Sequence, residues 1–183
     1  MARTTIILVV SLYLNAYFKL TLAACPKDIL DLRFLQLPTG RPGSPDSIQT
    51  SSLEGCFSNG NFFAGGDNSI VMKVPGTPAN SGCVTTPNSL HCRTELHETS
   101  SWQPTSAVNS MTADLVVVNA GGSTCIGQIH IDESLSTKPA LQIYYNSNGA
   151  ITVGVERQRS GGGQVITPVG KVSPGVRFSY EVR

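Results

Sequence analysis

The chain has 183 residues, of which 40% are hydrophobic and only 14% are charged, and its formal net charge is +1. A chain of this length can form one domain with a full hydrophobic core. Because a nearly neutral sequence implies no broad basic surface, we expect no nucleic-acid partner. A polyanionic substrate would have to be held by a few local cations.

The first 24 residues are typical of a secretory signal peptide, because Arg3 precedes an apolar run over residues 6–14 and small residues follow at positions 23 and 24. We therefore expect residues 1–24 to be removed, a single mature domain over residues 25–183, and secretion to the extracellular space. Lys19 interrupts the run, so a stable membrane span is the weaker interpretation. The Leu-Ala-Ala-Cys sequence that ends at Cys25 leaves lipid attachment there open.

Five cysteines in an exported chain indicate disulfides with one thiol left over. Cys83 and Cys92 flank a segment typical of a turn, so we expect them to pair and to fix the strand that follows. Cys25 would pair with Cys56 by elimination, and Cys125 would be a buried free thiol. We expect no metal and no cofactor, because there is no Cys-x-x-Cys pair and the three histidines lack ligand spacing.

Beyond residue 25 the chain alternates short apolar runs with turn residues and almost nowhere shows a sustained helical period. One short helical turn is expected within residues 25–32. Asn148-Gly149 is a strong hairpin signal, and the three glycines at 161–163 mark another turn. The pattern predicts an all-β fold, a sandwich or jelly roll, with strands over residues 69–74, 112–119, 126–132, 140–145, 151–157 and 176–182.

Two short stretches carry residue types suited to catalysis: Arg-Thr-Glu-Leu, which begins at Arg93, and Gln-Ile-His, which begins at Gln128. Because strand side chains alternate between faces, Arg93, Glu95 and His97 would share one face, and Gln128 and His130 another. If those faces meet, they form a cleft with a guanidinium, an amide, an imidazole and a carboxylate to orient them. That inventory suits binding a carboxylate-bearing sugar and moving a proton from it.

These stretches resemble the paired motifs of polysaccharide lyase family 7, the alginate lyases. Trp102 also fits the family, and the family's opening segment is similar to Asp31-Leu32, Leu37-Pro38-Thr39-Gly40, Gly43-Ser44-Pro45-Asp46 and Ile48-Gln49. The resemblance covers nearly all of residues 25–183. It implies a β-jelly roll with a substrate groove, which cleaves a 1,4-linked acidic polysaccharide, alginate or a related polyuronate, by β-elimination. We expect a monomer.

The resemblance also implies roles for the motif residues. Gln128 and Arg93 would offset the charge of the substrate carboxylate and stabilise the enolate-like intermediate, as an oxyanion hole does. His130 would be the general base at C5, because an imidazole titrates near neutral pH. Glu95 would orient Arg93 rather than react.

His97 and Arg157 are candidate contacts to the polyanion. The family usually carries a second arginine where this chain has His97, and a neutral imidazole holds an anion less firmly. The ordinary interpretation of Arg157 is that it is one of several scattered cations on the surface.

The family's third motif, aromatic-Phe-Lys-x-Gly-x-Tyr, is absent, and Tyr144, Tyr145 and Tyr180 do not stand in it. We therefore expect a sequence truncated before its C-terminal strands, which is inactive or poorly folded as it stands. Ile129, at the centre of Gln-Ile-His, favours guluronate-containing blocks within the family.

Several alternatives stay open at this point. Arg93 and Glu95 could form a solvated ion pair, and His130 could be a structural histidine in an apolar strand. The substrate could be glucuronan or another polyuronate. The chain could also be a secreted carbohydrate-binding jelly roll without catalysis, because fold alone does not fix function.

Overall fold

A computed structural model of the chain describes residues 25–32, 35–41, 44–74, 76–78, 83, 85, 91–100, 102–103, 105–131, 134, 136, 138–158, 160 and 162–183. The expected signal peptide, residues 1–24, lies outside this part of the chain. Within the described residues no helix is both long enough and apolar enough to cross a membrane.

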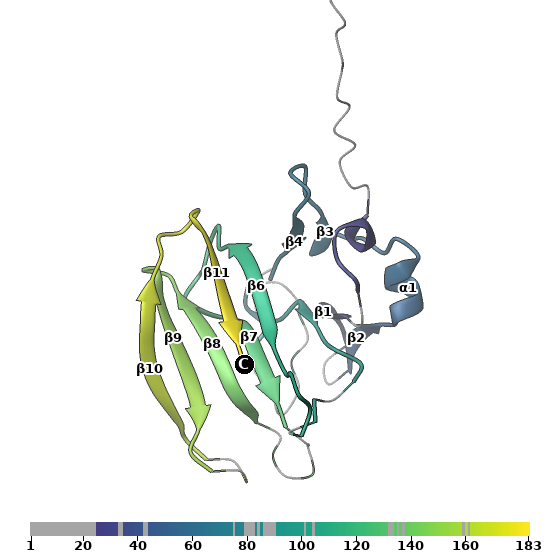
Figure 1. The fold of residues 1–183 in the computed structure, drawn as a ribbon. Coiled ribbons are helices and arrows are strands. Elements are labelled where there is room, and N and C mark those ends of the chain that lie inside the picture. Colours follow the sequence, from purple (N-terminus) through teal and green to yellow (C-terminus); the bar gives the residue numbers. More distant parts are fainter. Residues whose placement is uncertain are drawn as a thin grey trace, which may run out of the picture.

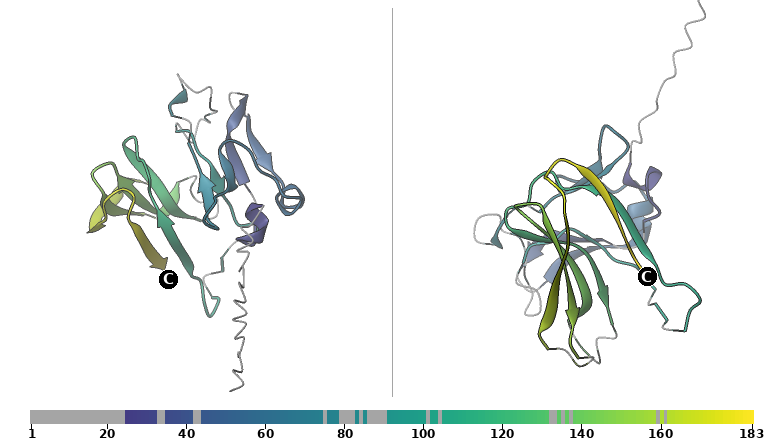
Figure 2. Two further views of the ribbon diagram at one scale, coloured as in Figure 1. Left: turned by 90° about the horizontal axis from the view of Figure 1, so that it is seen from above. Right: turned by 60° about the vertical axis from the view of Figure 1, so that its left-hand side comes forward.

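The C-terminal half forms an antiparallel four-stranded sheet in the order β10-β9-β8-β7 (Figure 1). Its strands are β7 (Ser123–His130), β8 (Pro139–Asn146), β9 (Ala150–Glu156) and β10 (Gln164–Lys171). A second antiparallel pair consists of β6 (Met111–Val116) and β11 (Arg177–Val182). In two further views this pair forms a separate layer over the four-stranded sheet (Figure 2).

Aromatic contacts join these two layers. The ring of Tyr145, which is fully buried, stacks on that of Phe178 with centroids 6.0 Å apart. The Tyr180 hydroxyl donates a 2.6 Å hydrogen bond to the carbonyl of Ile126 on β7. The hydroxyl of Tyr145 also donates to the carbonyl of Val172 at 2.8 Å, so both tyrosines pack their rings between the layers and satisfy their polar ends. The result is a β-sandwich, as the sequence predicted.

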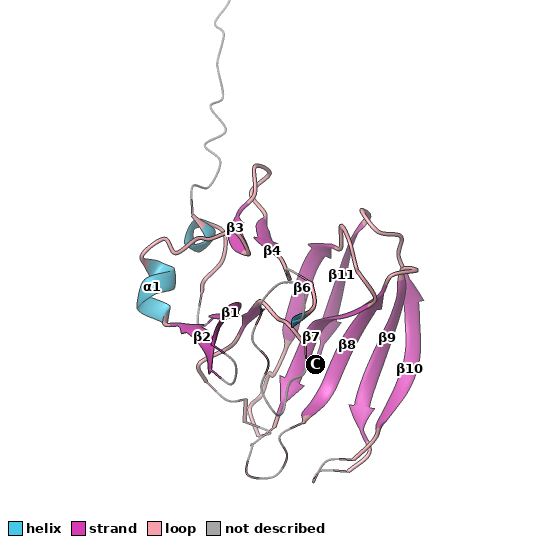
Figure 3. Ribbon diagram, turned by 180° about the vertical axis from the view of Figure 1, so that it is seen from behind, coloured by secondary structure: helices cyan, strands magenta, loops and turns pink. Residues whose placement is uncertain are grey.

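The N-terminal half contains a three-stranded sheet, β2-β1-β5, and a hairpin, β3-β4 (Figure 3). A small core forms here around the buried side chains of Leu32, Leu53 and Phe62, with Leu96 among the residues packed against it. The elements are a 3-10 turn (Pro26–Asp28), β1 (Leu35–Arg41), β2 (Ser44–Ile48), α1 (Thr50–Glu54), β3 (Phe62–Ala64), β4 (Ile70–Met72) and β5 (Glu95–Leu96).

All the predicted strands and the predicted helical turn are present in the structure. Each of the six expected strands corresponds to one of β4, β6, β7, β8, β9 and β11, and the expected helical turn is the 3-10 turn at Pro26–Asp28. The Asn148-Gly149 hairpin joins β8 to β9, with Gly149 at φ +83° and its N–H bonded to the carbonyl of Asn146 at 2.8 Å. The strand expected to begin at Arg93 is present as the two-residue β5, whereas the strands β1, β2, β3 and β10 and the helix α1 were not predicted.

The cysteine pairing is also confirmed. Cys25 bonds to Cys56 and Cys83 bonds to Cys92, with Cα atoms 5.2 and 5.7 Å apart. Cys125 is free but exposed, so the expectation that its thiol is buried was wrong.

A methyl group added at Gly127 should disturb the contact between the layers. Its Cβ would overlap the Tyr180 hydroxyl and lie 3.2 Å from the Met111 methyl carbon. We expect Gly127→Ala to lower the free energy of unfolding by about 1–3 kcal/mol in urea denaturation, because overpacking between layers forces side chains to move. Gly170→Ala, whose Cβ would meet nothing within 4 Å, is the control. Equal losses for the two variants would contradict this account of the interface.

The two disulfides should stabilise to different extents. Their cysteines are 31 and 9 residues apart, and the chain-entropy model gives about 3–4 kcal/mol for the longer loop and about 2–3 kcal/mol for the shorter one. We therefore expect the Cys25→Ser/Cys56→Ser double variant to lose more free energy of unfolding than Cys83→Ser/Cys92→Ser. A larger loss from opening the shorter loop would show that native contacts near Cys83 and Cys92, rather than loop entropy, decide the effect.

Candidate active site

A β-bulge in β7 sets which side chains share a face of the four-stranded sheet. Cys125 is paired with Tyr144, Gly127 with Ile143 and Gln128 with Gln142, so Ile126 is the extra residue. An extra residue reverses the alternation of the strand. Cys125 and Gln128 therefore point to the same side, the one away from β6 and β11, which we call the polar face. This is why the thiol is exposed rather than buried in the sandwich.

Glu95 reaches this face from the N-terminal half of the chain. Its neighbour Leu96 packs against the small core, and alternation along β5 gives Glu95 the opposite direction. The segment is further held by the Thr94 hydroxyl, which donates a 2.6 Å hydrogen bond to the carbonyl of Lys73. The side-chain amide of Gln128 donates to Glu95 Oε1 at 2.5 Å. The two predicted motifs, 33 residues apart at this contact, therefore meet.

Arg93 lies beside the same carboxylate. Its Nε is 3.7 Å from Glu95 Oε2, and the two side chains are only 30% and 23% exposed. The ion pair considered as an alternative thus exists, but it is partly buried and shares its carboxylate with Gln128. An amide and a guanidinium are held side by side by one carboxylate, which is the arrangement expected for binding an anion.

The remaining predicted residues lie around this cluster. His130 ends β7, is exposed, and by alternation faces the same side as Gln128. His97 is exposed and follows β5 directly. Arg157 is exposed just beyond the end of β9, and none of the hydrogen bonds or ion pairs found among the described residues joins it to Glu95 or Gln128. The structure brings together Arg93, Glu95 and Gln128, and it does not bring Arg157 to them.

A row of polar side chains that sequence reasoning missed continues from Gln128 across the polar face. The Nε2 of Gln142 is 3.5 Å from Gln128 Oε1 and 3.8 Å from the sulfur of Cys125. The Oε1 of Gln142 accepts from the Tyr144 hydroxyl at 2.7 Å and from Gln164 Nε2 at 2.9 Å. The signal available in the sequence was the alternation of side chains within residues 139–146 and 164–171. Alternation alone does not show which residues are cross-strand partners, because that depends on the register.

Gly154 makes room for the far end of this row. It lies on β9 between Gln142 on β8 and Ile166 on β10 in the register. A Cβ there would overlap the Gln164 amide and lie 2.9 Å from Ile166 Cδ1. Because β9 offers no side chain at this position, the amides of Gln142 and Gln164 meet over it.

The three tyrosines that the sequence left unassigned are now placed. Tyr145 on β8 and Tyr180 on β11 lie between the two layers and face each other's sheet, and both hydroxyls donate to carbonyl groups. Tyr144 lies on the polar face, and desolvation raises the pKa of its phenol, with a further contribution from nearby Cys125. Its hydroxyl is therefore neutral at physiological pH.

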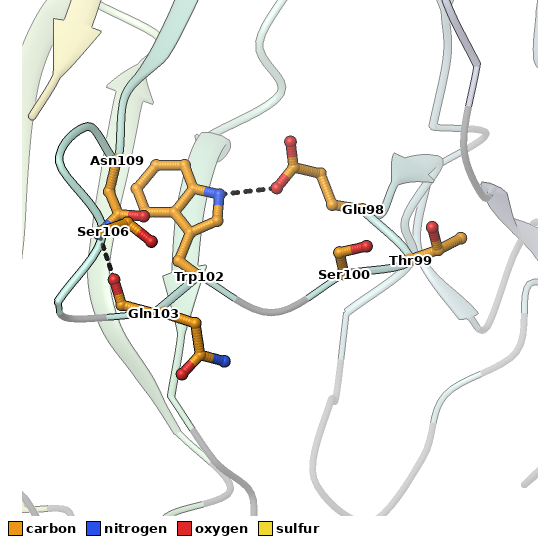
Figure 4. Close-up of a pocket in the computed structure, with 7 residues that line it drawn as sticks. All are labelled: Glu98, Thr99, Ser100, Trp102, Gln103, Ser106 and Asn109. Atoms are coloured by element: carbon orange, nitrogen blue, oxygen red, sulfur yellow. Dashed lines mark hydrogen bonds between the residues drawn. The ribbon is translucent and has the colours of Figure 1, made fainter.

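A polar pocket of about 300 Å³ lies apart from this cluster, between the end of β5 and the start of β6 (Figure 4). The indole N–H of Trp102 donates to Glu98 there at 2.7 Å, and the side chain of Asn109 donates to the carbonyl of Gln103 at 2.8 Å. The lining contains none of the predicted catalytic residues. It consists of Glu98, Thr99, Ser100, Trp102, Gln103, Ser106 and Asn109.

Among the described residues no group of three or more His, Cys, Asp or Glu side chains is arranged to hold a metal ion. The cluster of Arg93, Glu95 and Gln128 supplies hydrogen-bond donors and a cation instead.

The family model described as alginate lyase matches residues 30–183. The chain belongs to the alginate lyase family. It is accordingly a polysaccharide lyase, as the paired motifs predicted, and its reaction is β-elimination on a polyuronate. Comparison with curated protein sequences finds no match.

Crystal structures of family 7 alginate lyase A1-II′ share the fold. The form in complex with substrate (GGMG) is 21% identical, with a TM-score of 0.67 over 87% of this chain and 70% of that one. The form with product (GGG) is 23% identical, with a TM-score of 0.67 over 87% and 72%. A third structure, at 1.0 Å, is 23% identical, with a TM-score of 0.67 over 87% and 71%. The predicted jelly-roll sandwich is thereby confirmed.

Cys125 gives a chemical probe of the polar face. Desolvation raises the pKa of its thiol, although hydrogen bonds with Gly127 and Gln142 oppose this in part. Because the thiolate is the form that alkylates, we expect the midpoint of the pH–rate profile for iodoacetamide to lie higher in the folded chain than in the urea-unfolded chain with its disulfides intact. Identical midpoints would contradict the packing described around the sulfur.

Proposed function

We propose that this lyase acts on guluronate-containing blocks of alginate, and that Gln128, Arg93 and His130 carry the reaction. The observation that supports this most directly is the hydrogen bond from Gln128 to Glu95, with Arg93 on the other oxygen of the same carboxylate. It gives one substrate carboxylate an amide donor and a cation from two distant segments of the chain.

The proposed chemistry starts with that substrate carboxylate. Arg93 and one N–H of Gln128 bind it and offset its charge, so that the proton at C5 becomes acidic enough to remove. His130 takes the C5 proton when the epimer presents it on that side. The electron pair of the C5–H bond forms the C4–C5 double bond as the C4–O4 bond breaks; O4 takes up a proton from solvent, and His130 returns the C5 proton to solvent. Glu95 keeps the amide and the guanidinium in place.

The choice of substrate rests on three observations. The chain's net charge of +1 gives no broad cationic surface, so local groups such as Arg93 must recognise the polyanion. Ile129 stands at the centre of Gln-Ile-His, as in family members with activity on guluronate blocks. The structures of alginate lyase A1-II′ that share this fold hold a substrate written GGMG and a product written GGG.

Secretion is part of the same proposal. Two disulfides are typical of proteins that fold in an oxidising compartment. The N-terminal charge followed by an apolar run over residues 6–14 is the pattern of an export signal.

Turnover measurements on point variants test the assignment, and detectable turnover by the parent chain would also contradict the expectation that it is inactive. With guluronate-rich alginate, we expect Gln128→Ala to lower kcat by about 10²–10³-fold, because one donor to the developing negative charge is lost. We expect His130→Ala to lower it by about 10²–10⁴-fold. The measurement is the ultraviolet absorbance of the unsaturated ends that β-elimination creates.

His91→Ala is the matched control, because His91 is an exposed histidine outside the cluster. Its kcat should match that of the parent chain. Mannuronate-rich alginate and glucuronan, assayed in parallel, test the block preference. Full turnover by Gln128→Ala or His130→Ala, or an equal loss in His91→Ala, would exclude the proposed roles. Retardation on an alginate affinity gel with no unsaturated product would favour the carbohydrate-binding alternative.

A further inference from the structure

Gln142 is placed to control the orientation of the Gln128 amide. The two glutamines are direct cross-strand partners in the β7–β8 ladder, so their side chains leave adjacent backbone positions on the same face. The Nε2 of Gln142 lies 3.5 Å from the Oε1 of Gln128.

The direction of these hydrogen bonds follows from Glu95. An ionised carboxylate can only accept, so Gln128 must turn its NH₂ group toward Glu95, and its oxygen then lies on the side of Gln142. That oxygen needs a donor, and Gln142 supplies one. The oxygen of Gln142 is in turn held by the hydroxyl of Tyr144 and the amide of Gln164.

We propose that Gln142 is a positioning residue, which holds the amide of Gln128 with its N–H groups toward Glu95 and the substrate carboxylate. The inference rests on the proposed role of Gln128 as a donor to that carboxylate. An amide rotated by 180° would present its oxygen to an anion, which replaces attraction with repulsion. The row of Gln142, Tyr144 and Gln164 therefore acts on the reaction through Gln128.

A purely structural role for Gln142 makes a different prediction. If the row only stabilised the sheet, its loss would lower the free energy of unfolding and leave the turnover of the folded enzyme unchanged. A positioning role lowers kcat with little change in KM, because the oriented N–H matters most when charge develops in the transition state.

The first test is Gln142→Met, which keeps the length of the side chain and removes its donor. On guluronate-rich alginate we expect kcat to fall about 10–100-fold while KM stays within about twofold. In the Gln128→Ala background the same change should cost less than about twofold, since the amide that it positions is gone. Gln158→Met, at an exposed position beyond β9, is the matched control and should behave as the parent chain. An unchanged kcat, or an equal loss in both backgrounds, would overturn the proposal.

The Gln142→Glu variant keeps the proposal testable if Gln142→Met does not fold. A carboxylate still accepts from Tyr144 and Gln164 but donates neither to Gln128 nor to the Cys125 sulfur, so the row keeps its far end, loses its near end and gains a negative charge there. We expect kcat at saturating substrate to fall at least as far as in Gln142→Met. Parent-like kcat in a folded Gln142→Glu chain would overturn the proposal.

A readout without turnover separates this inference from the proposed function. The side-chain NH₂ resonances of Gln128, assigned by their loss in Gln128→Ala, should shift in Gln142→Met and stay in place in Gln158→Met. If the parent chain makes no unsaturated product but these resonances shift, the proposed function fails while the positioning contact stands. Resonances that do not move would overturn the inference whatever the activity.

Discussion

The hydrogen bond between Gln128 and Glu95 is the contact on which the candidate active site depends. It joins the four-stranded sheet to a strand of only two residues from the other half of the chain. Because Leu96 is held in the small core, Glu95 has a fixed direction, and because its carboxylate only accepts, every amide that follows has its orientation set. The fixed carboxylate of Glu95 thus determines, for each glutamine amide in the row, whether its nitrogen or its oxygen faces the next group.

The sandwich supports this row from behind. On one side of β7 and β8, Tyr145 stacks on Phe178 of β11 and Tyr180 of β11 donates a hydrogen bond to the carbonyl of Ile126 on β7. On the other side the strands carry amides and a phenol. The bulge at Ile126 lets a single strand serve both requirements, since it adjusts the alternation just before Gln128. The same two strands therefore carry the packing side chains on one face and the polar side chains of the candidate site on the other.

Much of this was accessible from the sequence, for identifiable reasons. The strands with regular alternation were predicted, because alternation is a local property, and the sequence indicated that a cleft would form if the faces of Glu95 and Gln128 met. The strand β10 was missed because Pro168 and Gly170 lie within it, and both residues normally argue against a strand; the structure accommodates them with an irregularity between these positions. Gln142 and Gln164 were missed because their contact depends on register across three strands. The exposure of Cys125 depends on a β-bulge that no local sequence pattern indicates.

The glycine at the centre of β9 has a consequence for the continuity of the polar face. Neighbouring strands lie about 4.8 Å apart, so the backbones of β8 and β10 are separated by about twice that distance. Only the missing side chain at Gly154 lets the amides from these two strands join into one continuous surface. A larger residue there would divide the surface into two compartments, one with Gln128 and one with Gln164. The continuity of the polar face from β7 to β10 therefore depends on a residue that contributes no side chain to it.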